Sequence, residues 1–344
     1  MKTRTIGFRD AQIELAHGAG GKATRRLIEG LFVPYLDNER LAQLADAAYV
    51  EANGQRLAVT ADSFVVKPLT FPGGTIGELA VNGTVNDLAV SGARPIALLT
   101  TFILEAGLPT NVLEPQVETM ARAAQNAGVP IVGGDTKVVE HGQCDGMYIT
   151  SSGLGVVDPR ASLSAKSVRP GDQVLVSGPI GDHGITILLA RGDLDLEADL
   201  SSDTRSVWPF VDALLSACGP HLRWMRDPTR GGVATALNEL ARDADVAVTI
   251  FEEAIPVRDP VRGACEILGL DPLHIACEGQ FLAVVGPEAV DIALAALRSV
   301  PGGEGAVRIG EIGTEPSRTV IGHSSYGGHR VIDVLVGDPL PRIC

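Results

Sequence analysis

The chain has 344 residues, a formal net charge of -14, a hydrophobic fraction of 45% and an aromatic fraction of 4%. This length gives room for about two domains that each bury a core, and the composition excludes a disordered chain. The charge argues against nucleic acids and anionic membrane surfaces as partners, because both require cationic patches.

A glycine cluster near the N-terminus, His17-Gly18-Ala19-Gly20-Gly21-Lys22, leads into a helical pattern at residues 23–31. Backbone N–H groups of such a loop can bind phosphate. The cluster is not a P-loop, which would need Gly in place of Ala16 and Ser or Thr in place of Ala23. We expect Gly18, Gly20, Gly21 and Lys22 to cover a bound phosphate, and a flexible hinge is the alternative.

Strand-like runs alternate with helical patterns along the rest of the chain. The runs are residues 56–60, 96–104, 147–157, 173–177, 246–251, 281–285, 307–312 and 331–336. The helical patterns are residues 75–92, 112–127, 183–191, 209–217, 232–244, 259–268 and 288–300. The alternation predicts an α/β (α+β) fold. Turn residues at 158–171 predict a boundary, so we expect an N-terminal domain at 1–157, a C-terminal domain at 158–336 and a tail at 337–344.

The clearest helical pattern begins at Thr75, which forms a capping box with Glu78. Apolar residues follow at helical spacing until Gly92 ends the pattern. Asp87 lies inside this helix, and Gly83, four residues earlier, leaves space beside it. An acid at this position is therefore a candidate ligand rather than a surface charge.

Several further aspartates lie at the ends of predicted elements. Asp62 follows the run 56–60, Asp135 follows the run of apolar residues at 131–132, and Asp227 precedes a helix that begins near Gly231. Carboxylates from several loops can bind Mg²⁺ together with a nucleotide. Arg230 and the N–H groups of that helix favour an anion. Taken singly, each aspartate can instead cap the backbone.

The chain ends in Cys344, behind Pro339 and Pro341. These prolines prevent a helix and predict an extended, mobile arm whose eight residues reach roughly 26 Å. The α-carboxylate of Cys344 disfavours the thiolate, so we expect the sulfur to react when it docks beside cationic groups.

The number and spacing of the cysteines indicate a reducing environment. All five are widely spaced, and they contain no C-x-x-C motif, which argues against disulfides and zinc. The longest apolar stretch, residues 95–104, is about half of the roughly 20 residues that a transmembrane helix needs. No apolar signal segment follows Met1. We therefore expect a cytoplasmic protein.

Five ordered motifs resemble the ATP-binding superfamily of aminoimidazole ribonucleotide synthetase. They are Asp62–Val66, Phe71–Gly74, Gly83–Ala93, Gly133–Lys137 and Asp227–Gly232. With the ending Pro341-Arg342-Ile343-Cys344, the chain is similar, within that superfamily, to the carbamoyl dehydratases of [NiFe]-hydrogenase maturation.

The resemblance implies a homodimer formed by the N-terminal domains, with ATP and Mg²⁺ bound in clefts near the interface. It makes Asp62, Asp87, Asp135 and Asp227 candidate Mg²⁺ or phosphate-network residues. It also implies that a carbamoyltransferase, HypF, loads the terminal sulfur with a carbamoyl group. ATP then drives its dehydration to thiocyanate, and cyanide passes to iron on the HypC–HypD scaffold.

The chemistry of that reaction requires proton-handling groups. An amide oxygen leaves readily only after phosphorylation and removal of the N–H protons. We expect Lys137 to neutralise the oxygen or phosphate and Glu278 to act as the base, with the sulfur of Cys344 carrying the substrate. Asn86, Thr136 and Arg230 are candidate nucleotide contacts. Lys137 can alternatively be a surface cation, and Glu278 a solvated loop acid.

Three alternatives remain open. Thiamine-monophosphate kinase and selenophosphate synthetase would share the ATP site, although the latter ordinarily has a catalytic Cys or selenocysteine in its N-terminal loop. This chain has no Cys before Cys144. A non-catalytic thiol carrier or scaffold is the third alternative, and it predicts no ATP consumption.

Overall fold

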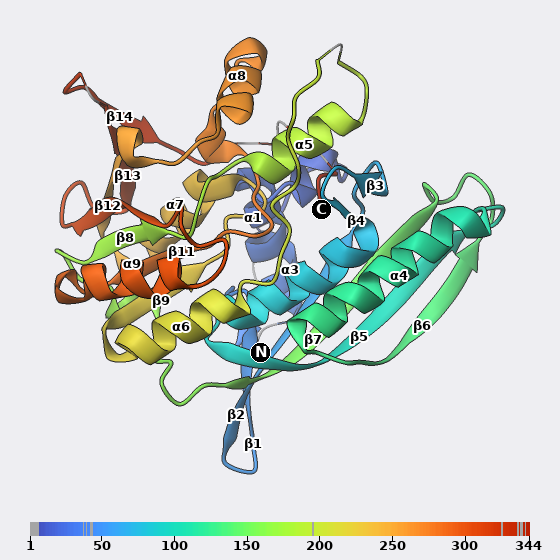
Figure 1. Cartoon of the computed structure of the whole chain (residues 1–344), viewed down its shortest axis with the longest axis horizontal. Coiled ribbons are helices and arrows are strands. Elements are labelled where there is room, and N and C mark those ends of the chain that lie inside the picture. The colour runs from blue at the N-terminus through green and yellow to red at the C-terminus, as the bar shows by residue number, and fades with distance from the viewer. Residues whose placement is uncertain are drawn as a thin grey trace.

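The computed structural model describes residues 7–36, 38, 40–41, 44–194, 196–324, 326–335, 337, 340 and 342–344. Two main sheets, one with five strands and one with seven, organise the molecule, and helices pack on both (Figure 1). The predicted α/β fold is confirmed. None of the helices in the described part of the chain has the length and apolar character that a bilayer crossing requires.

The five-stranded sheet has the order β1-β2-β7-β5-β6. Its strands are β1 (Ala48–Ala52), β2 (Gln55–Phe64), β5 (Ala93–Glu105), β6 (Ile131–Val139) and β7 (Met147–Val157). Only β5 and β6 are parallel among these pairs, because α4 (Thr110–Ala127) returns the chain between them. The small hairpin of β3 (Thr70–Phe71) and β4 (Gly74–Thr75) leads into α3 (Ile76–Val90).

Helices α3 and α4 lie side by side over one face of this sheet (Figure 1). Thr75 caps α3 as predicted, since its side chain accepts a hydrogen bond from the Glu78 N–H at 3.2 Å. The fully buried Leu79 of α3 packs with Leu98 of β5 in one core. The helix is buried on nearly all sides and thereby forms the centre of the molecule.

No helix among the described residues covers the opposite face of the five-stranded sheet. Side chains alternate between the faces of a strand, so the exposed Val59 and Leu99 point away from α3 and α4. Asp135 and Lys137 are register partners of Thr101 and Ile103 of β5, and they therefore share this open face.

The seven-stranded sheet has the order β14-β13-β10-β12-β8-β11-β9. Its strands are β8 (Gln173–Val176), β9 (Leu222–Arg226), β10 (Ala247–Phe251), β11 (Leu282–Val285), β12 (Val307–Gly313), β13 (Thr319–His323) and β14 (His329–Ile332). Helices α6 (Trp208–Cys218) and α9 (Val290–Ser299) pack on one face, and α7 (Gly232–Ala244) packs on the other. Helices α5 (Asp182–Ala190) and α8 (Asp259–Leu268) contribute residues to the same hydrophobic core as α3.

The N-terminal segment contacts the part of the chain that follows β14. It contains η1 (Leu15–Gly18), α1 (Lys22–Leu27), the π-helical turn η2 (Ile28–Phe32) and α2 (Val33–Leu36). The Lys22 N–H donates to the Leu335 carbonyl at 3.1 Å. The chain leaves β14 after Ile332 to make this contact, so the strand predicted at 331–336 begins earlier and ends sooner, with Val336 outside the described residues.

Candidate nucleotide and thiol site

Three aspartates from separate parts of the chain form a cluster. Ligand atoms of Asp46, Asp87 and Asp227 all lie within 4.8 Å of one another. Asp46 precedes β1, Asp87 is on α3 and Asp227 directly follows β9. Thr60 on β2 supports two of them, since its hydroxyl lies 2.7 Å from the Asp87 carboxylate and 2.8 Å from the Asp46 carbonyl. The cluster therefore joins the two sheets.

Burial in this cluster favours protonated carboxyls or a bound cation. Burial is the main cause that raises the pKa of Asp46 and of Asp87 well above 3.8, and the charge of Asp62 adds to the shift at Asp87. Burial likewise raises the pKa of Asp227 to about 6. Carboxylates this close together repel one another, and a divalent cation bound by them would neutralise that repulsion.

A cavity of about 220 Å³ opens beside the cluster. Its lining includes Asp62, Asp87, Asp227, Arg230, Glu278 and Cys344. All six were candidate site residues in the sequence. Asp46, two residues before β1, was not a candidate, and no sequence pattern marks it.

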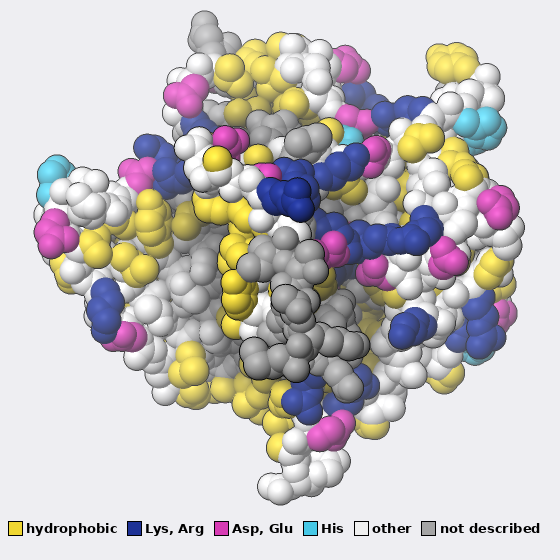
Figure 2. All heavy atoms as spheres, turned by 180° about the vertical axis from the view of Figure 1, so that it is seen from behind, with side chains coloured by type: hydrophobic (Ala, Val, Ile, Leu, Met, Phe, Trp, Pro, Cys, Tyr) yellow, Lys and Arg dark blue, Asp and Glu magenta, His cyan; other side chains and the backbone are white. Residues whose placement is uncertain are grey.

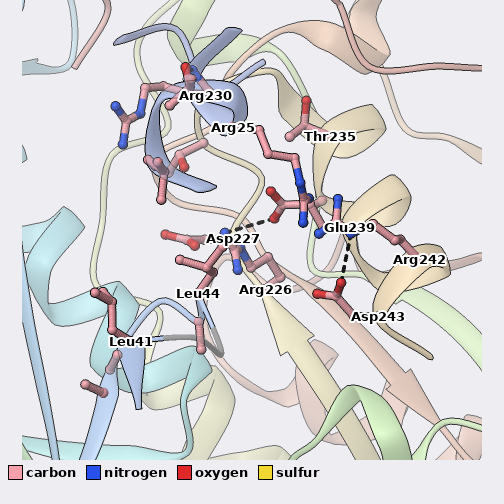
Figure 3. A pocket seen from close by; sticks show the side chains of 18 of the residues that line it. Arg25, Leu41, Leu44, Arg226, Asp227, Arg230, Thr235, Glu239, Arg242 and Asp243 are labelled. Atoms are coloured by element: carbon pink, nitrogen blue, oxygen red, sulfur yellow. Dashed lines mark hydrogen bonds and ion pairs between the residues drawn. The ribbon is translucent and has the colours of Figure 1, made fainter. Parts of the chain in front are cut away.

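A second cavity, of about 440 Å³, continues from the first and is rich in arginine (Figure 3). Arg25, Arg226, Arg230 and Arg242 line it. Arg226 is held between the Asp46 carboxylate at 2.8 Å and the Glu239 carboxylate at 3.1 Å. The surface also carries gathered Lys and Arg side chains near the middle of one face (Figure 2). A cleft that combines these cations with the acid cluster suits a polyanion with a divalent cation.

The glycine cluster lies against this cleft. Gly20 has a left-handed φ of 80°, and a Cβ there would lie 2.7 Å from the Arg230 Cβ. Arg230 in turn donates to the Gly18 carbonyl at 3.1 Å. Only glycine permits this approach without strain, so the predicted loop is placed over Arg230.

Gly21 and Lys22 line a neighbouring cavity of about 330 Å³ instead. The Lys22 ammonium lies 2.6 Å from the Asp333 carboxylate. The structure therefore corrects the prediction for Lys22, whose charge already has a partner outside the acid cluster.

The C-terminal tail is docked rather than extended away. The Val65 N–H donates to the Cys344 carbonyl at 2.9 Å, and the Lys67 N–H donates to the Arg342 carbonyl at 3.3 Å. Leu340 and Ile343 are 3% and 2% exposed and belong to the core of α3. Apolar burial and backbone pairing thus oppose the mobility that we predicted from Pro339 and Pro341, which themselves lie outside the described residues.

Docking places a cation beside the terminal residue, as we expected. The charge of Cys344 is the main cause that raises the pKa of Arg230. Arg230 thus lies between the glycine loop and the tail, within reach of both.

Glu278 is buried in the same cavity and is not a solvated loop acid. Its side chain is 3% exposed, and burial, with the charges of Asp227 and Asp203, raises its pKa well above 4.5. The Asp203 carboxylate accepts the Glu278 N–H at 3.0 Å. A buried carboxyl group with a raised pKa is a common proton-transfer group at functional sites.

Asn86 does not face the cavity, which corrects its assignment as a nucleotide contact. Its amide nitrogen donates to the carbonyls of Arg205 at 2.9 Å and of Glu278 at 3.0 Å, and its oxygen accepts the Val207 N–H at 2.8 Å. Asn86 therefore holds the backbone of Glu278 against α3.

Asp135, Thr136 and Lys137 lie on β6, away from the acid cluster of the same chain. The side chains of Asp135 and Lys137 are 56% and 66% exposed and form an ion pair at 2.5 Å. Asp46, rather than Asp135, completes the cluster. Within one chain, the prediction that Asp135 and Lys137 join the other site residues is wrong, because β6 is an edge strand on the open face.

The chain matches two family models. The N-terminal domain of AIR synthase related proteins matches residues 44–157, and the C-terminal domain of the same family matches residues 169–323.

Similar proteins align over nearly the full length. Carbamoyl dehydratase HypE of Azotobacter vinelandii is 50% identical over 339 residues, covering 98% of this chain and 99% of the relative. A crystal structure of HypE in complex with ATP is similar, with 45% identity, a TM-score of 0.81 and coverage of 97% of this chain and 100% of the other. A crystal structure of a HypE–HypF complex matches with 43% identity, a TM-score of 0.85 and coverage of 90% and 99%.

Proposed function

Because the chain belongs to the carbamoyl dehydratase HypE family within the AIR synthase related proteins, we propose that its ATP-dependent dehydration acts on a carbamoyl group carried by its own Cys344. The reaction serves hydrogenase maturation. The observation that supports the assignment to Cys344 is its position in one cavity with Glu278, Arg230 and the acid cluster.

The reaction converts an S-carbamoyl group into a thiocyanate. The carbamoyl oxygen takes the γ-phosphoryl group of ATP, which gives ADP and a phosphate ester. The nitrogen loses its protons, the C–O bond breaks and phosphate departs with its electron pair. The sulfur then carries a C≡N group, and the net change is loss of one water, which hydrolysis of ATP to ADP and phosphate takes up.

The acid cluster would hold Mg²⁺ through Asp46, Asp87 and Asp227, with Asp62 beside it. Mg²⁺ held by these carboxylates would neutralise negative charge on the phosphates. Arg230 would bind the phosphates together with the glycine loop, because Gly18 and Gly20 already lie against it.

Glu278 is the proposed base. Burial raises its pKa well above 4.5, which makes its carboxylate a stronger base toward the carbamoyl nitrogen. Three contacts fix its peptide, since Asn86 binds its carbonyl and Asp203 accepts both its N–H and that of Gly279. A base held this firmly can face a substrate that arrives on a docked peptide.

We further propose a homodimer through the open face of the N-terminal sheet. That face exposes Val59 at 39% and Leu99 at 50%, which a monomer would leave in water. Asp135, Thr136 and Lys137 lie on β6 of this sheet, with Asp135 and Lys137 on its open face, and across a two-fold interface they would reach the cleft of the partner subunit. Lys137 would there neutralise the carbamoyl oxygen or the transferred phosphate.

HypF is a partner of this family, as the HypE–HypF complex indicates. We propose that HypF supplies the carbamoyl group and that a HypC–HypD scaffold accepts the cyanide. Both transfers occur on other proteins, so the docked tail must leave the cavity and return between them.

Cys344→Ser tests the proposal. We expect this variant to bind ATP normally, because the nucleotide binds in the cleft and not to the sulfur. We expect it to form no thiocyanate, because the sulfur that carries the carbamoyl group is absent. The measurement is the mass of the C-terminal peptide after incubation with HypF, a carbamoyl donor, ATP and Mg²⁺. Wild type should lose one water from the carbamoylated peptide, and Cys144→Ser, at a half-buried cysteine that does not line the cavity, should behave as wild type.

Two outcomes would contradict the proposal. A cyano group formed by the Cys344→Ser variant would mean that the sulfur is wrongly assigned. A wild-type carbamoyl group that persists with ATP and Mg²⁺ would favour a non-catalytic carrier. Nothing in the cavity favours the thiamine-monophosphate kinase or selenophosphate synthetase alternatives, which have no use for a docked terminal thiol.

A further inference from the structure

His183 contacts the tail at the residue before Cys344. It lies in the first turn of α5 and is fully buried. Its Nε2 is 2.7 Å from the Ile343 carbonyl oxygen, and its Nδ1 is 2.7 Å from the Ser202 hydroxyl. The edge of the ring also packs against Phe71, with centroids 5.7 Å apart.

The hydrogen-bond partners determine which ring nitrogen carries the proton. A carbonyl oxygen can only accept, so Nε2 of His183 is the donor to Ile343. The Ser202 hydroxyl accepts the Thr204 N–H at 3.1 Å and donates its own proton to Nδ1. Burial lowers the pKa of His183, which keeps the ring neutral and in this tautomer.

The loop that orients His183 also holds the proposed base. Next to Ser202, the Asp203 carboxylate accepts the N–H groups of Glu278 at 3.0 Å and of Gly279 at 3.3 Å. One short segment, residues 202–205, therefore contacts both the residue that binds the tail and the peptide of Glu278.

Besides the Val65 N–H, which donates to the Cys344 carbonyl itself, other contacts of the tail lie further from the sulfur. Arg191 donates to the Arg342 carbonyl at 2.8 Å. Leu340 packs against Gly184, where an added Cβ would lie 3.3 Å from its Cδ1. Among the described residues, His183 is a fully buried polar side chain, and it binds the residue directly before Cys344. Its donor would be left without a partner if the tail departed, which favours the docked state.

We propose that His183 is a positioning residue, which holds the Ile343 carbonyl and so sets the S-carbamoyl group of Cys344 opposite Glu278. The proposal rests on the function proposed above. In this proposal, residues 202–205 fix the distance between the S-carbamoyl group of Cys344 and Glu278. When the tail leaves for carbamoylation, the bond from His183 to Ile343 must break.

The test compares His183→Leu, which removes both ring nitrogens, with His183→Gln, whose amide N–H can replace Nε2. His183→Leu should raise the rate of Cys344 alkylation by iodoacetamide and slow dehydration in a single turnover of pre-carbamoylated protein, each roughly tenfold, as expected for one lost hydrogen bond. His183→Gln should restore both rates in large part. Carbamoyl transfer from HypF should not slow, because it uses the undocked tail, and ATP binding should remain as in wild type.

Two further variants guard against misfolding and general effects. Ser202→Ala removes the group that orients the ring, and we expect a smaller change in the same direction. His221→Gln, at an exposed histidine that pairs with Glu288, should change nothing. Alkylation is read from the mass of the C-terminal peptide, so the other cysteines do not interfere.

Unchanged alkylation and dehydration rates in His183→Leu would overturn the proposal. Equal losses in His183→Leu and His183→Gln would also overturn it, because they would indicate a packing role. If wild type itself shows no dehydration while alkylation still depends on His183, then the proposed function fails and tail docking by His183 stands.

Discussion

The clustered carboxylates of Asp46, Asp87 and Asp227 oppose folding in order to serve binding. Asp227 is buried, Asp46 and Asp87 are partly buried, and each lies near others of the same charge, while Arg226 binds Asp46 at 2.8 Å. Proteins commonly retain such unfavourable groups at functional sites, where a ligand neutralises them. Without a bound cation, the protein should therefore be less stable than a variant in which a neutral side chain replaces one of these carboxylates.

Asp227→Asn tests this cost. The raised pKa of Asp227, about 6, means that the folded state binds more protons than the unfolded state between about pH 4 and pH 6, so stability falls as pH rises through this window. Without Mg²⁺ we expect the variant to be more stable at pH 7 by on the order of 1–3 kcal/mol, with a flatter pH dependence. Dehydration should be lost. Urea unfolding at several pH values measures the first effect.

Asp135→Asn is the matched control, since Asp135 is exposed and paired with Lys137. We expect its stability to stay within about 0.5 kcal/mol of wild type. An Asp227→Asn variant less stable than wild type at pH 7 would show that the carboxylate stabilises the fold and would contradict the argument.

Residue patterns identified part of this cluster and missed part. Asp87 and Asp227 were predicted because each adjoins a helix with clear apolar spacing or a glycine start. Asp46 precedes a short strand with little periodicity, so only its distance from Asp87 shows its role. The hydrogen bonds of Asn86 to Glu278 join residues far apart in sequence, which no local pattern predicts.

At the level of elements, α3 connects the capping signal, the core and the site. Gly83 provides space on it, as predicted, although Phe64 and Glu278 occupy that space. A Cβ at Gly83 would lie 2.9 Å from the Phe64 ring and 3.8 Å from the Glu278 carboxylate. The absent side chain thus lets the base approach the helix.

Gly83→Ala should therefore harm both packing and catalysis. Alanine favours the helix by roughly 1 kcal/mol, but displacement of Phe64 should exceed this gain and lower stability by roughly 1–3 kcal/mol. Dehydration should slow more than ATP binding weakens, because Glu278 moves. Thermal unfolding and single-turnover rates measure the two effects.

Gly263→Ala on α8 is the control, since a Cβ there meets nothing within 4 Å. This substitution should raise stability by roughly 0.5–1 kcal/mol and leave the rate unchanged. A Gly83→Ala variant that behaves the same way would show that the space at Gly83 has no function.

Elements with strong periodicity were predictable and those without were not. Helices α7 and α8 occur at the predicted residues, and β7 matches its predicted bounds. Strands β1, β3, β4, β6, β9 and β13 were not predicted, because β6 is exposed along most of its length and the others are short. The tail was predicted from its prolines alone, whereas the apolar sockets for Leu340 and Ile343 arise only in the folded chain.

For the whole molecule, the fold class followed from the sequence, but the composition of the active site did not. Asp135 and Lys137 belong to a motif of the resembling family, yet they lie on the open face away from the acid cluster. Spacing along one chain cannot indicate that a residue acts in a partner subunit. The exposed apolar side chains on the same face are the physical reason to expect one.

Mixed dimers test whether Lys137 acts across the interface. Lys137→Ala and Asp87→Asn should each be inactive alone. When the two are co-expressed with different tags, a mixed dimer holds one cavity with intact acids that receives Lys137 from the other chain. Random pairing should then restore about a quarter of the wild-type rate. Asp87→Asn mixed with Asp227→Asn should restore nothing, because both acids belong to the cavity of one chain. No recovery in the first mixture would place Lys137 outside the partner's site, and the exposed sheet face would then need another explanation.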